Sequence, residues 1–201
     1  MFSTQKEYTV KILSGSPKVC RVRFPTDEEW CNRARKQRTI RRSIGRGQTI
    51  TETPDAQKAT CELFEKIRID ADGQEFDSVD SCRVIEKLER CDVLSVDRCG
   101  DTYQVKLSVP GGEVSHVVRL PLQKDVLDYG RSSVRRQDGR RESISTVSLE
   151  PGRAFYDRIF VSAEGYEGEA PASIPIIHKD TVLVEVITAM DSEESEDDEL
   201  G

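Results

Sequence analysis

Apolar and polar residues alternate with a period of two near the start of the chain, over residues 8–13 and 18–24. The segment Ser14-Gly15-Ser16-Pro17, which separates the two runs, consists of residues that favour turns. Because successive side chains of a strand point to opposite faces, this pattern predicts two half-buried strands joined as an N-terminal β-hairpin.

Three helical patterns follow the hairpin. The first begins at Thr26, a favourable N-cap residue with Glu29 at the spacing of a capping box, and we expect it to continue to about Ile44. The second begins at Thr53-Pro54, and the third covers residues 78–91. Both are predicted because their apolar residues recur at three- and four-residue spacing.

Alternation with a period of two returns in residues 93–98, 102–109 and 114–120, which are separated by glycine-containing turns. This pattern predicts a three-stranded antiparallel meander with one buried face. The following residues, 129–148, are mostly polar and contain five arginines. We interpret them as an Arg-rich connector, partly helical and partly mobile.

The last part of the chain is predicted to be helical. Pro151 is expected to begin a helix that ends near Gly165, and Pro175 to begin the final one. The β-branched run TVLVEVIT, residues 181–188, leaves a strand as the alternative, although its apolar spacing favours a helix. Residues 191–201 are rich in acids and poor in apolar residues, which predicts a disordered tail.

Together these elements predict an α+β chain. It would contain an N-terminal β-hairpin, helices, a three-stranded antiparallel meander, C-terminal helices and a disordered acidic tail. The expected divisions are an α+β domain over 1–128, the Arg-rich connector over 129–148, a C-terminal helical portion over 149–190 and the tail over 191–201.

Composition and charge limit the class of protein. The chain is 36% hydrophobic and 33% charged, which suits a water-exposed domain with a core. Its net charge is −7, and seven acids lie between residues 191 and 199, so residues 1–190 are neutral overall. There is no apolar run of about 20 residues that could cross a bilayer, and no apolar signal segment at the N-terminus. We therefore expect a cytoplasmic protein.

Residues that carry out chemistry are sparse. The six cysteines include no C-x-x-C pair and are expected to be thiols, with Cys61 and Cys82 as small core residues. The two histidines, His116 and His178, have no ligand-spaced neighbours and are interpreted as structural or surface residues. The acidic loop 70–77 does not match the spacing of an EF-hand. We predict no catalytic residue, no metal, no cofactor and no enzymatic activity.

The most unusual feature is a basic segment between residues 32 and 47, which contains seven cations and no acid. Three interpretations stay open: binding of an acidic protein partner, binding of nucleic acid, or a solvated basic face. The lack of interleaved aromatic residues argues against nucleic acid. A further hypothesis is that the acidic tail competes with the ligand of this segment. The candidate partner-binding residues are Arg33, Arg35, Lys36, Arg38, Arg41, Arg42 and Arg46.

Several short strings occur together in this chain. They are FPTDEEW at residues 24–30 with the Arg-rich run to Gly45-Arg46-Gly47, VVRLP at 117–121 before Asp128-Tyr129, FYDR at 155–158, EGY at 164–166, and IPIIHK at 174–179. This arrangement resembles proteins encoded in the tail-gene modules of tailed phages and prophages, and is most similar to tail assembly chaperones.

The resemblance implies a non-enzymatic role in virion morphogenesis, in the cytoplasm of the host cell. Such chaperones bind the long tape measure protein and help tail tube proteins to polymerise around it, and they have no catalytic residues. Many of them are mainly helical, so the predicted meander is a departure from the family. The alternatives are a structural virion protein of the tail or head–tail junction, or a nucleic-acid-binding regulator.

Overall fold

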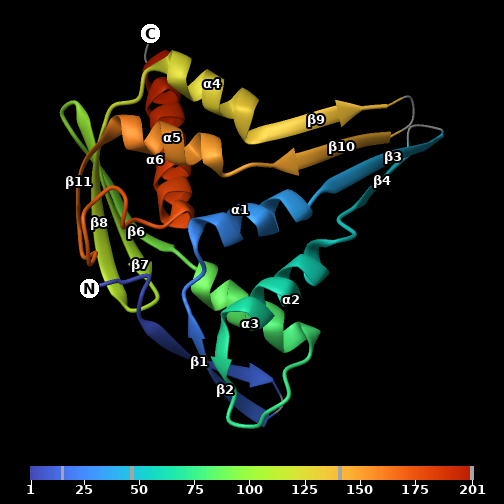
Figure 1. The fold of residues 1–201 in the computed structure, drawn as a ribbon. Coiled ribbons are helices and arrows are strands. Elements are labelled where there is room, and N and C mark those ends of the chain that lie inside the picture. Colours follow the sequence, from blue (N-terminus) through green and yellow to red (C-terminus); the bar gives the residue numbers. More distant parts are fainter. Residues whose placement is uncertain (15, 46–47, 140–141, 200–201) are drawn as a thin grey trace. The chain divides into compact units, whose positions relative to one another are not determined.

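The computed structural model describes residues 1–14, 16–45, 48–139 and 142–199. Within these residues the chain forms six helices and eleven strands in three antiparallel sheets, which confirms the predicted α+β class (Figure 1). The chain divides into two compact units. Unit 1 comprises Met1–Ser3, Arg90–Tyr129 and the chain from Pro151, and unit 2 comprises Thr4–Glu89 and Gly130–Glu150.

Unit 2 begins with the predicted hairpin, strands β1 (Glu7–Ser14) and β2 (Ser16–Arg23). Strand β5 (Arg68–Asp70) adds a third strand beside β2. Helices α2 (Ala56–Ile67) and α3 (Ser78–Glu89) form where the apolar spacing predicted them, and α3 contacts β1. Their apolar faces supply much of the core of this unit, which includes the buried side chains of Trp30, Phe64 and Ile85.

Helix α1 (Asp27–Lys36) begins at the predicted capping box but is shorter than predicted. The prediction that it reaches Ile44 is wrong, because the chain forms strand β3 (Thr39–Gly45) and strand β4 (Gln48–Glu52) instead. Thr39, Ile40 and Ile44 are β-branched and pack well on a pleated surface. Pairing with a distant segment therefore outweighs the favourable helix propensity of the intervening arginines.

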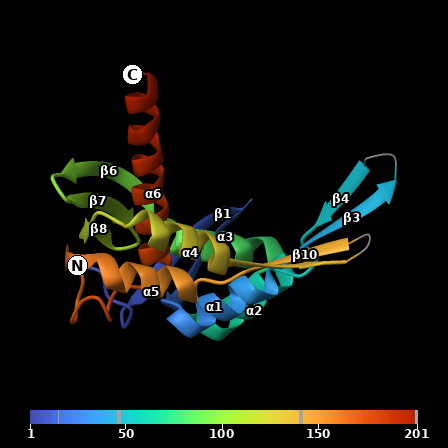
Figure 2. The same cartoon turned by 90° about the horizontal axis from the view of Figure 1, so that it is seen from above.

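That distant segment is the one predicted to be a connector. Strands β9 (Val134–Asp138) and β10 (Glu142–Val147) occupy most of residues 129–148, and β10 pairs with β3 so that Ile144 lies opposite Ile40. The divisions of the structure therefore differ from the expected ones, since residues 130–150 belong to unit 2. Figure 2 shows β3, β4 and β10 extending beyond helices α1 and α2 of the same unit.

Unit 1 contains the predicted meander, strands β6 (Asp92–Cys99), β7 (Thr102–Val109) and β8 (Gly112–Arg119). The alternation is confirmed in β7, where Tyr103, Val105 and Leu107 are buried. A fourth strand, β11 (Phe160–Glu164), pairs with β8. It takes the place of the end of a predicted helix, because α5 (Glu150–Ile159) stops before it. Helix α4 (Gln123–Ser133) spans the point where the chain passes from unit 1 into unit 2.

The final helix, α6 (Ile176–Glu199), contacts β6 and β7. The run TVLVEVIT is helical, as its spacing favoured. Helix α6 extends into the acidic segment that was predicted to be a tail, and residues 200–201 lie outside the described part. Extending an existing helix costs far less than starting one, and glutamate is a good helix former. In the described part of the chain, no helix has the length and apolar content to span a bilayer.

Candidate interaction surfaces

The candidate cations lie on two elements rather than on one helix. Arg33, Arg35 and Lys36 belong to α1, and Arg38 follows it directly. Strand β3 carries Arg41 and Arg42, while Arg46 lies outside the described residues.

Several of these cations have carboxylate partners within unit 2. Arg33 donates to Glu89 at 2.8 Å and to Thr60 at 3.2 Å, and only 12% of its side chain is exposed, so its role is structural. Arg35 pairs with Glu150, Lys36 with Glu62 at 2.5 Å, and Arg38 with Asp55 at 3.3 Å. The last three cations are about half exposed. Exposed pairs contribute only about 0–1 kcal/mol, so a partner's carboxylate can replace the internal one at low cost.

These three exposed cations line a common hollow of about 410 Å³ between α1 and α2. Lys58, on α2, adds a fourth cation, whereas the carboxylates in the lining are Asp55 and Glu62. The hollow therefore has an excess of two positive charges. Lys58 gives no signal in the sequence pattern because it belongs to a different helix, and only tertiary packing brings it next to the basic segment. We call this site the cationic hollow, and its charged residues are Arg35, Lys36, Arg38, Asp55, Lys58 and Glu62.

A second basic surface is the four-stranded sheet with the order β4-β3-β10-β9. It joins the two most basic segments of the chain. Residues 38–52 contain four arginines and one acid, and residues 131–142 contain five arginines and two acids. These segments together carry six more positive than negative charges, in a chain whose net charge is −7.

The strand register divides the side chains of this sheet between two faces, because directly opposite residues share a face. One face, which we call the hydroxyl face, carries Thr39, Arg41, Ser43, Thr49, Thr51, Arg136, Asp138, Ser143 and Ser145, with Val134 and Val147 at its far end. The other face carries Ile40, Arg42, Ile50, Arg135 and Ile144 among others. On this other face Arg42 lies 3.1 Å from both Glu52 and Glu142, so its charge is neutralised within the sheet.

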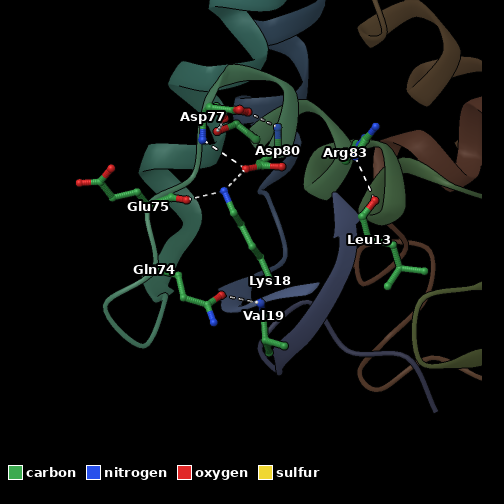
Figure 3. A network of polar contacts seen from close by, with 9 residues as sticks. Leu13, Lys18, Val19, Gln74, Glu75, Asp77, Asp80 and Arg83 are labelled. Atoms are coloured by element: carbon green, nitrogen blue, oxygen red, sulfur yellow. Dashed lines mark hydrogen bonds and ion pairs between the residues drawn. The ribbon is translucent and has the colours of Figure 1, made fainter. Parts of the chain in front are cut away.

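A buried ion pair anchors the N-terminal hairpin (Figure 3). The Lys18 ammonium, on β2, lies 2.5 Å from the carboxylate of Asp80, which is fully buried, and donates to the Glu75 carbonyl at 2.7 Å. At the start of α3, the backbone N–H of Asp80 donates to the Asp77 carboxylate at 2.8 Å, and the Asp77 N–H donates back to Asp80 at 3.4 Å. This geometry is that of a capping box, so the acidic loop 70–77 positions α3 against the hairpin.

Additional contacts support the same anchoring role. The Gln74 side-chain oxygen accepts from the N–H of Val19 at 2.9 Å, and Arg83 donates to the Leu13 carbonyl at 3.0 Å (Figure 3). Each of these bonds connects the hairpin to the loop or to α3. We therefore assign the cluster to stability rather than to binding.

The two histidines form part of a buried chain of hydrogen bonds in unit 1. His116 Nδ1 lies 2.7 Å from the Tyr156 hydroxyl, and the Tyr166 hydroxyl lies 2.9 Å from both His116 Nε2 and His178 Nδ1. Both imidazoles are fully buried, and burial lowers the pKa of His116 to about 4 and that of His178 to about 3. Both rings are therefore neutral at physiological pH, as polar parts of the core.

The cysteines are thiols. Cys61 and Cys82, expected in the core, are only half-buried, on α2 and α3. Among the described residues, no group of three or more acidic, histidine or cysteine side chains is placed to hold a metal ion. Comparison of the chain with protein-family models, with curated proteins and with solved structures gave no match.

Proposed function

We propose that this protein is a non-enzymatic assembly factor that binds an acidic segment of a partner protein in the cationic hollow. The observation that carries the proposal is the convergence of Arg35, Lys36, Arg38 and Lys58 around one hollow of about 410 Å³. Guanidinium groups form paired, charge-assisted hydrogen bonds with carboxylates, and lysine adds a mobile point charge. The internal ion pairs of these residues are exposed and weak, so they keep the cations in place without blocking exchange.

The resemblance to tail assembly chaperones suggests the class of partner. Under this proposal the partners are phage tail proteins, the tape measure and the tail tube, and the binding takes place in the host cytoplasm. A chaperone for a long client needs an accessible charged surface rather than an enclosed pocket. The half-exposed cations on α1 meet that need. The main alternative is a structural protein of the tail or the head–tail junction.

A pull-down tests the partner. The tagged protein would be expressed together with its neighbouring genes, and the proteins that copurify identified by mass spectrometry. We expect a very long helical protein and a tube subunit. Recovery of no protein partner, or of nucleic acid alone, would contradict the proposal.

A neutralised variant tests the site. We choose Arg35→Gln/Lys36→Gln/Arg38→Gln because glutamate at these positions would face Glu150, Glu62 and Asp55 and could unfold the unit by repulsion. The matched control is Arg21→Gln/Arg90→Gln/Lys106→Gln, which removes the same charge from exposed positions outside the hollow. The first variant should lose the partner and the control should keep it.

Purified particles separate the chaperone from the structural alternative. A chaperone should be missing from them, whereas a structural protein should be present in a fixed number of copies. Detection of a fixed copy number would favour the structural alternative, in which the same surface binds a neighbouring protein of the tail or of the head–tail junction.

A further inference from the structure

We infer that the hydroxyl face of the sheet β4-β3-β10-β9 is a separate binding site for the phosphate backbone of duplex DNA. This inference is independent of the cationic hollow, because it uses other residues and a ligand of another class.

The chemistry of the hydroxyl face is that of phosphate contacts. The face consists of six hydroxyls, the two guanidinium groups of Arg41 and Arg136, and the carboxylate of Asp138, with the valines Val134 and Val147 at its far end. Arginine, serine and threonine are among the residues that usually donate to phosphate oxygens in protein–DNA complexes. A sheet face that packs on a core would carry mainly apolar residues, whereas here only Val134 and Val147 are apolar and both are exposed, so the rest of the face is suited to water or to a polar ligand.

The register arranges these groups in rows. Arg41 lies directly opposite Thr51 on one neighbouring strand and Ser143 on the other, so hydroxyls flank its guanidinium on both sides. Arg136 lies opposite Ser145 in the next row of the same face. Side chains two residues apart on one strand are separated by about 7 Å, which allows the rows to engage different phosphates.

The face is open to a ligand. Arg41, Arg136 and the neighbouring hydroxyls line a surface hollow of about 620 Å³ together with the carboxylates of Asp138 and Glu142, and Glu142 is paired with Arg42 at 3.1 Å. Within the described part of the chain Arg41 makes no ion pair, and Arg136 makes an exposed pair with Asp138 at 2.7 Å. Such an exposed pair is weak, so a phosphate can take the place of Asp138.

Charge and side-chain composition favour a duplex over a single strand. The four strands carry four arginines and three acids, and the sequence segments that contain them, residues 38–52 and 131–142, carry an excess of six positive charges, which suits the continuous charge of DNA. Strands β3, β4, β9 and β10 contain no aromatic residue, so the bases of a single strand would find no stacking platform. The hairpins β3-β4 and β9-β10 are joined through β3 and β10 into one four-stranded sheet, whose hydroxyl face offers donors to a phosphate backbone (Figures 1 and 2).

Two variants of the full-length protein test the inference on the same strands. Arg41→Gln/Arg136→Gln removes the cations of the hydroxyl face, and Arg42→Gln/Arg135→Gln removes two cations from the opposite face at adjacent positions. The change in net charge is identical, so general attraction to DNA falls equally in both. Only direct phosphate contacts distinguish them.

The readout is fluorescence anisotropy with a labelled duplex of about two helical turns, titrated at several salt concentrations from about 50 mM. Wild type should bind with an affinity that falls steeply with salt. The hydroxyl-face variant should bind at least tenfold more weakly, and the slope of log K against log salt should decrease in magnitude by about two, as expected for two lost phosphate contacts. The control should stay within about threefold of wild type.

Three results would overturn the inference: no binding of wild type at about 50 mM salt, an equal loss in both variants, or tighter binding to a single strand of the same sequence. Circular dichroism of each variant establishes that it is folded. Because the hydroxyl-face variant leaves the cationic hollow intact, recovery of the protein partner by this variant separates failure of this inference from failure of the proposed function.

Discussion

Replacing Lys18 with methionine should destabilise unit 2 more than any exposed charge change. In wild type the Lys18 ammonium lies 2.5 Å from the Asp80 carboxylate, whose side chain is fully buried, while 26% of the Lys18 side chain is exposed. Methionine keeps an apolar stem but removes the ammonium, which also lies over the Phe76 ring at 5.6 Å from its centroid. The substitution leaves the Asp80 carboxylate charged and buried without the Lys18 ammonium.

The expected loss in the free energy of unfolding follows from the different burial of the two charges, because Asp80 is fully buried and Lys18 is partly exposed. Removing one partner of a buried ion pair costs about 3–5 kcal/mol, and partial exposure of Lys18 places Lys18→Met near the lower end. Asp80→Asn should cost only about 1–2 kcal/mol, because the amide oxygen can still accept from the Asp77 N–H and the ammonium can reach water. The double variant Lys18→Met/Asp80→Asn should be more stable than Lys18→Met alone, because it removes both charges.

Urea unfolding measures these differences through Trp30, the single tryptophan of the chain, which is buried in unit 2. We expect the order of free energies of unfolding to be wild type, Asp80→Asn, the double variant and then Lys18→Met. If Lys18→Met lost less than about 1 kcal/mol, or if the two single effects simply added in the double variant, the pair would not be a buried anchor.

Two further predictions concern unit 1. Gly165 has a φ of +91°, and a Cβ there would lie 2.7 Å from the Glu113 carbonyl oxygen, so Gly165→Ala should lower the free energy of unfolding by about 2 kcal/mol or more. Gly100→Ala, at φ +63° in open space, should cost only about 1 kcal/mol, and equal melting temperatures of these variants would contradict the strain argument. Burial lowers the pKa of His116 to about 4 and of His178 to about 3, so both stay neutral in the fold while the unfolded chain takes up protons below about pH 6.5. Proton uptake by the unfolded chain has no effect on the free energy of unfolding above about pH 6.5. It lowers this free energy as the pH falls towards 4, by at most about 2.7 kcal/mol per pH unit for the two histidines together. Urea unfolding at pH 7.5 and 5, followed by circular dichroism, measures this loss of stability. Burial raises the pKa of Asp180, so protonation of this carboxyl favours the folded state as the pH falls and opposes the effect of the histidines. The same measurement on Asp180→Asn removes this opposing contribution.

Local pattern predicted the elements that bury one face. The alternation in β7 and the capping box of α1 depend only on neighbouring residues, and both form as predicted. Local pattern could not predict the sheet that joins the two basic segments. Strand β9 has exposed side chains throughout and β4 nearly so, and hence neither shows an apolar alternation. The partner of β3 is also far away in the sequence.

The candidate sites, too, were predicted only as far as they depend on residues that are neighbours in the sequence. The basic segment was identified from its composition, and the structure places three of its cations, Arg35, Lys36 and Arg38, around one hollow. Composition gave no means of placing Lys58 beside them or Arg136 on the same sheet face as Arg41, because both depend on tertiary packing. Nor could it show that Arg33 and Arg42 are held by carboxylates from distant elements.

The most direct test of the cationic hollow is isothermal titration with a polyglutamate peptide, which serves as a probe of stated chemistry. Wild type and the variants with substitutions at Arg41 and Arg136, or at the control positions Arg21, Arg90 and Lys106, should bind it with similar affinity. The variant Arg35→Gln/Lys36→Gln/Arg38→Gln should bind at least tenfold more weakly, since it removes three of the four cations that line the hollow. Equal affinity of this variant and wild type would contradict the proposed binding site.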